Sequence, residues 1–87
     1  MDLGKLRDMQ MEQMSNKKCL PKSGIEVILH MVEEIGEVCE AIREEKGKEA
    51  FEEEVADILW QLNKLCWIHN IDLEKVFLKK LEKNAKR

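Results

Sequence analysis

Two pairs of acidic residues have a spacing suited to metal-dependent chemistry on phosphates. Glu34 and Glu37 form one pair and Glu54 and Asp57 the other, and the members of each pair are three positions apart. Residues at i and i+3 lie on the same face of a helix, so each pair would present two carboxylates side by side. The chain has 18 Asp and Glu among 87 residues, so such pairs also arise by chance on solvated helix faces.

The first pair lies at the edge of an apolar stripe. A helical wheel at about 100° per residue groups Glu34 with Glu37 and His30 beside the apolar arc and turns Glu33 toward solvent. The predicted core stripe of this helix consists of Ile28, Val32, Ile35, Cys39 and Ile42, and it is widened by Ile25, Leu29, Val27, Met31 and Val38. Burial beside that stripe would partly desolvate the Glu34 carboxylate.

The second pair lies on a helix that is apolar on two sides. Glu54, Asp57 and Gln61 occupy the strip between these sides. One side consists of Phe51, Val55, Ile58, Leu62, Leu65 and Cys66, and the other of Ala56, Trp60 and Trp67. Such a helix must pack against neighbours on both apolar sides, so we expect it at the centre of the bundle or at a subunit interface.

The two helices are joined by a short turn that contains Gly47, so they should run antiparallel. Their four carboxylates can then converge, and a cluster of like charges needs a counter-charge. A divalent cation would supply it. All-oxygen ligands favour Mg²⁺, with Mn²⁺ as the alternative, over zinc.

The pattern of helix signals predicts an all-α fold with about four helices. The expected helices cover residues 3–14, 24–45, 48–69 and 73–83, with a loop over 16–22. Ser23 and Asp72 are the predicted N-caps, and Gly47 the predicted C-terminal stop of the second helix. We interpret residues 1–87 as one small domain, with an N-terminal helix and loop over 1–22 and the motif-bearing helices over 23–87.

Length and composition limit the class of protein. An 87-residue chain buries only about 60% of its unfolded surface when it folds alone, which favours completion of the bundle by homo-oligomerisation. A mean hydropathy of −0.47 argues against a membrane span. The N-terminus has no apolar targeting segment, and the three cysteines form no disulfide pattern, so we expect a cytoplasmic protein.

Charge is distributed unevenly along the chain. Residues 26–57 hold 12 acids and three bases, whereas residues 75–87 hold six bases and one acid. The basic tail could attract a polyanion, but a pI near 5.4 and the lack of stacking aromatics argue against a nucleic-acid partner. Phosphates on a small ligand would satisfy the same tail.

Other constellations of reactive residues are incomplete. Cys66 and His69 have the spacing of half a zinc site, but no second pair accompanies them, so core packing is the simpler interpretation. The Glu-x-x-His pairs of di-iron bundles are absent from the sequence. There is also no Gly-rich phosphate loop and no Ser/His/Asp grouping.

The acidic motifs resemble those of a known family. Glu33-Glu34-Ile35-Gly36-Glu37, followed after sixteen residues by Glu54-Val55-Ala56-Asp57, is similar to the EExxE…ExxD signature of the MazG-like, all-α nucleoside triphosphate pyrophosphohydrolases. The stretches HMVEEIGEVCEAIRE, EEEVADILWQLNKLC and NIDLEKVFLKKLEKNAKR extend the resemblance over about residues 23–87.

The resemblance implies hydrolysis of a nucleoside triphosphate to the monophosphate and pyrophosphate with Mg²⁺, by a homodimer or tetramer. It implies four metal ligands, Glu34, Glu37, Glu54 and Asp57, with Glu34 or Glu37 as the base that holds the attacking water. Four further residues are implied or expected at the substrate, namely Lys80 and Asn84 of a K-x3-N pattern, and Gln61 and His30. Whether Glu33, the first acid of the motif, takes part stays open.

Departures from the family pattern leave the substrate base open. Relatives that act on pyrimidine deoxynucleotides carry aromatic residues upstream of the first motif, and this chain has none before Phe51. A tyrosine of some relatives is Gln61 here. Two functions therefore remain at this point: the pyrophosphohydrolase, and a helical interaction or regulatory protein that keeps the bundle without turnover.

Overall fold

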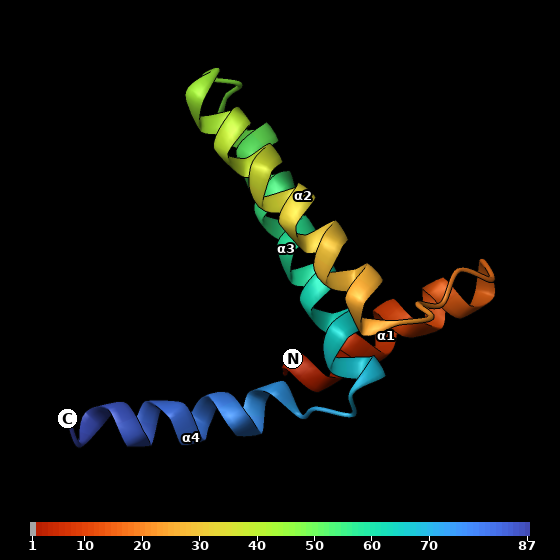
Figure 1. The fold of residues 1–87 in the computed structure, drawn as a ribbon, viewed down its shortest axis with the longest axis vertical. Helices are drawn as coiled ribbons and strands as arrows, with labels where there is room; N and C mark the ends of the chain where they lie inside the picture. Colours follow the sequence, from red (N-terminus) through yellow and green to blue (C-terminus); the bar gives the residue numbers. More distant parts are fainter. Residues whose placement is uncertain (1) are drawn as a thin grey trace.

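The chain folds into four α-helices joined by short turns. The computed structural model describes residues 2–87, and within this range it contains no strand. The helices are α1 (Leu3–Asn16), α2 (Gly24–Arg43), α3 (Lys48–Ile68) and α4 (Leu73–Ala85) (Figure 1). The all-α prediction is confirmed. None of the helices over residues 2–87 has the length and hydropathy needed to cross a membrane.

Side-chain caps begin α2 and α4 where the sequence predicts them. The Ser23 hydroxyl accepts a hydrogen bond from the Glu26 backbone N–H at 3.3 Å. The Asp72 carboxylate accepts one from the Lys75 backbone N–H at 3.2 Å. Each bond satisfies a backbone donor that has no partner within its own helix, so both helix starts are defined locally.

The end of α2 differs from the prediction that Gly47 stops it. Glu45, at φ 51°, is the left-handed residue after the helix. The Lys46 backbone N–H then donates to the Ala41 carbonyl at 3.1 Å, as in a Schellman turn. Gly47, at φ 96°, instead precedes α3 as its N-cap residue. The turn therefore reverses the chain two residues earlier than expected.

α2 and α3 lie side by side as an antiparallel hairpin (Figure 1). On α2, Val27 and Ala41 are buried, and Met31, Glu34 and Val38 are partly buried. These positions recur at helical spacing and form the strip that contacts α3. Glu34, predicted at the edge of the core, is thus in the middle of the packed face.

The predicted core of α2 is wrong for its central stripe in the single chain, whereas Val27, Met31 and Val38 of the wider predicted arc are buried or partly buried. Its members Ile28, Val32, Ile35 and Ile42 are 43–61% exposed, and Cys39 is exposed as well. The wheel places the core where the largest apolar residues gather, but this helix has two apolar strips. The smaller strip packs within the chain, and the larger one stays uncovered.

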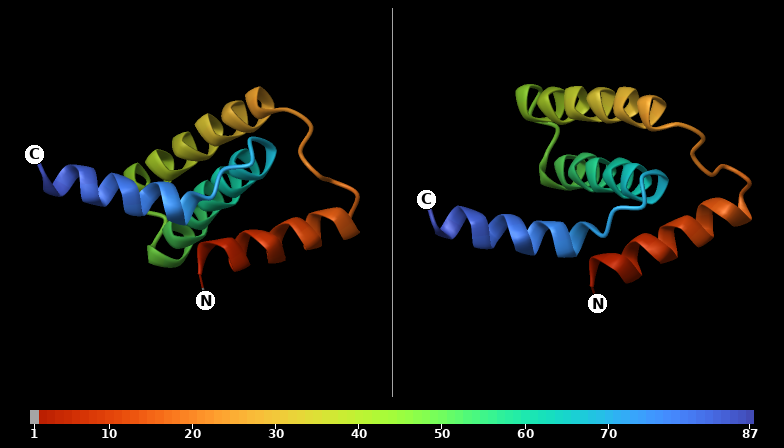
Figure 2. Two further views of the ribbon diagram at one scale, coloured as in Figure 1. Left: turned by 90° about the horizontal axis from the view of Figure 1, so that it is seen from below. Right: turned by 60° about the horizontal axis from the view of Figure 1, so that its bottom comes forward.

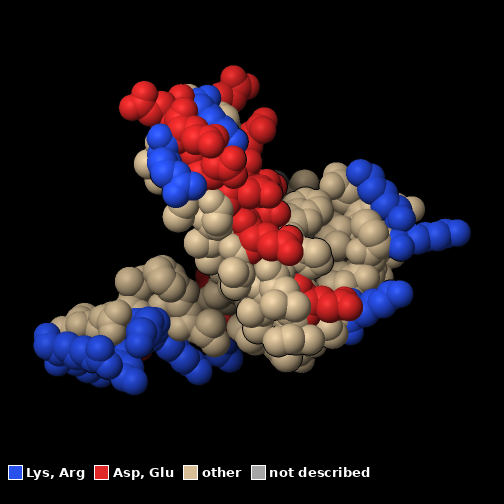
Figure 3. Space-filling model, turned by 45° about the horizontal axis from the view of Figure 1, so that its top comes forward, with Lys and Arg blue, Asp and Glu red and all other residues tan. Residues whose placement is uncertain are grey.

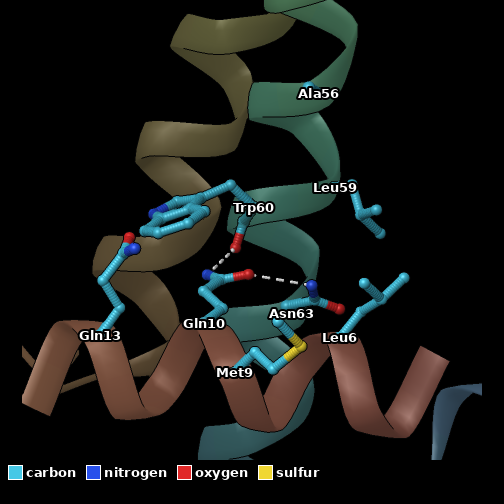
Figure 4. A pocket seen from close by; sticks show the side chains of 8 residues that line it. All are labelled: Leu6, Met9, Gln10, Gln13, Ala56, Leu59, Trp60 and Asn63. Carbon is cyan, nitrogen blue, oxygen red and sulfur yellow. Dashed lines mark hydrogen bonds between the residues drawn. The ribbon is translucent and has the colours of Figure 1, made fainter. Parts of the chain in front are cut away.

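α3 lies between α2 and the layer formed by α1 and α4 (Figure 2). α1 packs on α3 through a buried polar network: Gln10 Nε2 donates to the Trp60 carbonyl and Asn63 Nδ2 donates to Gln10 Oε1, both at 2.9 Å (Figure 4). Gln10 and Asn63 are 7% and 5% exposed. Because buried amides without partners are costly, this network defines how α1 lies on α3.

α4 extends away from the hairpin (Figures 1 and 2). The turn before it is held by two hydrogen bonds, from the Ile71 N–H to the Cys66 carbonyl at 2.8 Å and from Arg7 Nη1 to the Ile71 carbonyl at 3.1 Å. Asn70 adopts φ 53° in this turn. α4 contacts α1 and has no buried residue of its own.

Gln10→Ala should lower the free energy of unfolding by about 1–3 kcal/mol, because it leaves the Asn63 amide without its buried acceptor. Urea unfolding followed by circular dichroism at fixed protein concentration measures this change. Gln13→Ala, an exposed glutamine on the same helix, is the matched control and should stay within about 0.5 kcal/mol. Equal destabilisation by both variants would contradict a structural role for the network.

Candidate metal and nucleotide site

Three carboxylates from the two hairpin helices converge at one point. Glu34 of α2 and Glu54 and Asp57 of α3 each offer an oxygen, and these oxygens lie within 4.8 Å of one another. We call these three residues the acid cluster. Within residues 2–87 it is the one group of at least three His, Cys, Asp or Glu side chains that converges in this way.

The acid cluster has oxygens that no protein group satisfies. Glu34 Oε2 and Glu54 Oε2 are buried, and neither has a hydrogen-bond partner among the described residues. Asp57 is exposed, so one side of the cluster opens to solvent. Buried anionic oxygens normally pair with a cation or with donors. The all-oxygen donors and their spacing therefore fit a hard divalent cation such as Mg²⁺.

The two partly buried glutamates are hard to ionise. Burial is the main reason that the pKa of Glu34 lies above its ordinary value of 4.5, and the negative charges of Glu37 and Asp57 add to the rise. Hydrogen bonding to the Glu37 carboxyl is the main cause that raises the pKa of Glu54, followed by burial. A cation between these groups would reverse both effects, because it favours the charged forms.

Glu37, the fourth predicted ligand, lies beside the acid cluster but outside its group of converging oxygens. Its carboxyl influences both Glu34 and Glu54, so it is close to them, and its side chain is exposed. Glu33 points outward, where its Oε2 lies 3.6 Å from His30 Nδ1. The predicted outward orientation of Glu33 is therefore confirmed.

Gln61 continues the same strip of α3 one turn after Asp57. It is only 8% exposed, and its Oε1 has no hydrogen-bond partner among residues 2–87. A buried amide oxygen without a donor is rare in folded proteins. Gln61 Oε1 can therefore accept a hydrogen bond from a ligand beside the acid cluster.

His30 lines a cavity of about 300 Å³ at the base of the hairpin. Lys22, Ser23 and Lys64 line it as well. Lys64 follows Asp57 by seven residues, about two helical turns, and so lies on the same face of α3. Lys64 is not among the residues predicted for the site, although its spacing from Asp57 is visible in the sequence.

Lys80 and Asn84 are not brought to the acid cluster of their own chain. Both lie exposed on α4, which leaves the base of the hairpin and extends away from it (Figure 1). α3 continues for eleven residues after Asp57, a rise of about 16 Å, before the turn to α4 begins.

The structure gives no support to Cys66 and His69 as half of a zinc site. Cys66 is buried, and burial raises the pKa of its thiol, which disfavours the thiolate that binds zinc. His69 is exposed at the end of α3. Neither residue belongs to a converging group in the described part of the chain.

The surface charge follows the division seen in the sequence. Acidic side chains run along the hairpin from its tip, and basic side chains cover much of α4 (Figure 3). Near the tip, Lys46 Nζ lies 3.6 Å from Glu40 and 3.5 Å from Glu44, and these charges raise the pKa of Lys46. Among residues 2–87, no lysine, arginine or histidine forms a salt bridge with the acid cluster.

Comparison with known proteins supports the resemblance seen in the motifs. No curated protein and no solved structure matches the chain. A family model, the MazG nucleotide pyrophosphohydrolase domain, matches residues 22–87. This range contains α2, α3 and α4 and every residue of the acid cluster. The chain therefore belongs to the MazG nucleotide pyrophosphohydrolase domain family.

Proposed function

We propose that the protein is a Mg²⁺-dependent nucleoside triphosphate pyrophosphohydrolase that clears surplus or non-standard nucleotides. The observation that carries the proposal is the acid cluster, in which Glu34 and Glu54 each keep a buried oxygen without a partner. Family membership supports the reaction class. The substrate is a ribo- or deoxyribonucleoside triphosphate, and the products are the monophosphate and pyrophosphate.

Glu34, Glu54 and Asp57 would hold the metal, with Glu37 as a fourth ligand from the edge of the cluster. A bound Mg²⁺ neutralises triphosphate charge and lowers the pKa of an attacking water. Glu37 or Glu34 would accept a proton from that water. The water oxygen would bond to one phosphorus of the α–β anhydride, the bond from this phosphorus to the bridging oxygen would break with its electrons going to that oxygen, and the monophosphate and pyrophosphate would separate.

The substrate would lie along the side of the hairpin onto which Asp57 opens. Gln61 and His30 flank the acid cluster toward the base of the hairpin, where they can contact the sugar or the base. Lys80 would bind phosphate and Asn84 would orient the nucleotide. No aromatic residue precedes Phe51, so the structure offers no upstream ring to sandwich a pyrimidine.

The protein would act as a homodimer or a dimer of dimers. The uncovered strip of α2 presents Ile28, Val32, Ile35 and Ile42, and Val55 and Leu59 are exposed on the neighbouring α3. Contiguous apolar patches of this kind are rare on monomers. Two hairpins that share these strips would form a four-helix bundle with the acid clusters outside its core.

Purified protein with Mg²⁺ should release pyrophosphate, and not orthophosphate, from at least one of a panel of common and modified nucleoside triphosphates. Glu37→Gln and Asp57→Asn should each lower the rate at least about 100-fold, because each removes a charged ligand or base. Glu53→Gln, an exposed acid on α3, is the matched control. Full activity in both variants, or release of orthophosphate alone, would contradict this mechanism, whereas no hydrolysis of any triphosphate in the panel would favour the non-catalytic function.

Mg²⁺ should raise the melting temperature by several degrees, since a ligand at 100 times its Kd adds about 2.7 kcal/mol to the native state. The raised pKa values of Glu34 and Glu54 stabilise the metal-free protein at low pH, and this contribution is lost as pH rises through them. The metal-induced shift should therefore grow as pH rises through these raised pKa values. Glu54→Gln should reduce it, and a shift that falls with pH would contradict the assignment.

Ile35→Glu should shift the protein toward the monomer in sedimentation velocity runs, because it places a charge in the uncovered strip of α2. Glu26→Gln, on another side of the same helix, should leave the oligomeric state unchanged. An unchanged sedimentation coefficient in Ile35→Glu would mean that this strip is not the contact between chains.

A further inference from the structure

The cavity at the base of the hairpin holds two lysines that have no ion-pair partner. Lys22 and Lys64 line it together with Ser23, Glu26 and His30, and we call it the lysine cavity. In the described part of the chain, neither lysine forms a salt bridge or a side-chain hydrogen bond. Lys64 is partly buried, so its stem is held against the protein while its three N–H donors have no protein acceptor.

The charges of the lysine cavity favour an anion. Its two lysines outnumber its one acid, Glu26, whose side chain is exposed. Ser23 adds a donor, because its hydroxyl oxygen accepts from the Glu26 N–H while its hydrogen stays available. A phosphate group offers both the negative charge and the several acceptor oxygens that such donors bind.

The lining does not suit a nucleobase. Proteins usually bind a nucleobase by stacking aromatic rings or guanidinium planes on its flat faces. No Phe, Trp, Tyr or Arg lines the lysine cavity, and its one ring, the imidazole of His30, can cover one face at most. The lining therefore favours phosphate over the nucleobase.

The lysine cavity and the opening of the acid cluster lie on the same side of the hairpin. Lys64 follows Asp57 by seven residues and His30 precedes Glu37 by seven, so each pair shares a helix face at a separation of about 10 Å. The segment that carries Lys22 reaches the base of the hairpin from α1 (Figure 1). Lysine side chains on a helix lean toward its N-terminus, which for Lys64 is the direction of Asp57.

We infer that the lysine cavity binds the terminal phosphates of the nucleotide, with Lys64 as the main contact and Lys22 as the second. The metal in the acid cluster and the lysines would then divide the charge of the triphosphate between them. In this arrangement His30 contacts phosphate, and Gln61 is left to contact the sugar or the nucleobase. The inference rests on the proposed function, and it adds that the hairpin itself selects triphosphates over diphosphates.

Binding of inorganic pyrophosphate tests the inference without catalysis. Isothermal titration calorimetry with Mg²⁺ present should show that Lys64→Met weakens binding about 10- to 100-fold, because it removes the charge but keeps an unbranched apolar stem. Lys64→Arg should retain most of the affinity. Lys48→Met is the matched control, since Lys48 lies on the same helix outside the cavity, 3.8 Å from Glu52.

The acid of the cavity supplies a variant with the opposite sign. Glu26→Gln removes the charge that repels an anion, so pyrophosphate should bind about 2- to 5-fold more tightly. Equal affinities of Lys64→Met and Lys48→Met, or weaker binding by Glu26→Gln, would overturn the inference.

The substrate profile shows which part of the nucleotide the cavity holds. Lys64→Met should lower kcat/KM about 10- to 100-fold for a triphosphate and by less for the diphosphate of the same nucleoside. The factor should be the same for adenine, guanine, cytosine and uracil. A factor that changes with the nucleobase but not with the number of phosphates would place the nucleobase in the cavity and overturn the inference.

Failure of the inference differs from failure of the proposed function. Pyrophosphate binding that depends on Lys64, in a protein that hydrolyses no nucleoside triphosphate, would refute the proposed function and support the lysine cavity as a phosphate site. Hydrolysis of triphosphates that Lys64→Met leaves unchanged would refute only the inference.

Discussion

Repulsion between carboxylates that two helices bring together is the constraint on which this structure depends. Glu34 lies in the packed face of α2, opposite Glu54 and Asp57 of α3. Apolar contacts on both sides of this point, at Val27 and Ala41, keep the helices together although the acids oppose it. A cation that bound the acid cluster would relieve this repulsion, so its binding would stabilise the hairpin.

The helices and the acid cluster could be predicted from local signals. Ser23 and Asp72 begin helices through bonds to residues three positions on, and acids at i and i+3 share a helix face wherever the helix lies. The packing of α2 could not be predicted in this way. A wheel ranks strips by hydrophobicity, and here the most hydrophobic strip is the one left uncovered by the chain itself.

Other features depend on contacts between distant parts of the sequence. The bonds of Gln10 to Asn63 and Trp60 join residues at least 50 positions apart, and the bond from Arg7 to Ile71 spans 64. None of these bonds corresponds to a periodic pattern of residue types in the sequence. The position of α1 and the direction of α4 follow from these bonds. Sequence patterns therefore place Lys80 and Asn84 on a helix but not relative to the acid cluster.

α1 lies outside residues 22–87, the range matched by the family model, yet it contacts both α3 and α4 at the base of the molecule. Arg7 holds the turn that aims α4, and Gln10 fixes α1 against α3. The acid cluster and its two helices thus lie within the range of the family model, whereas Arg7, which orients α4, lies outside it. Substitutions in α1 alone can therefore change the direction of α4 while the acid cluster stays as it is.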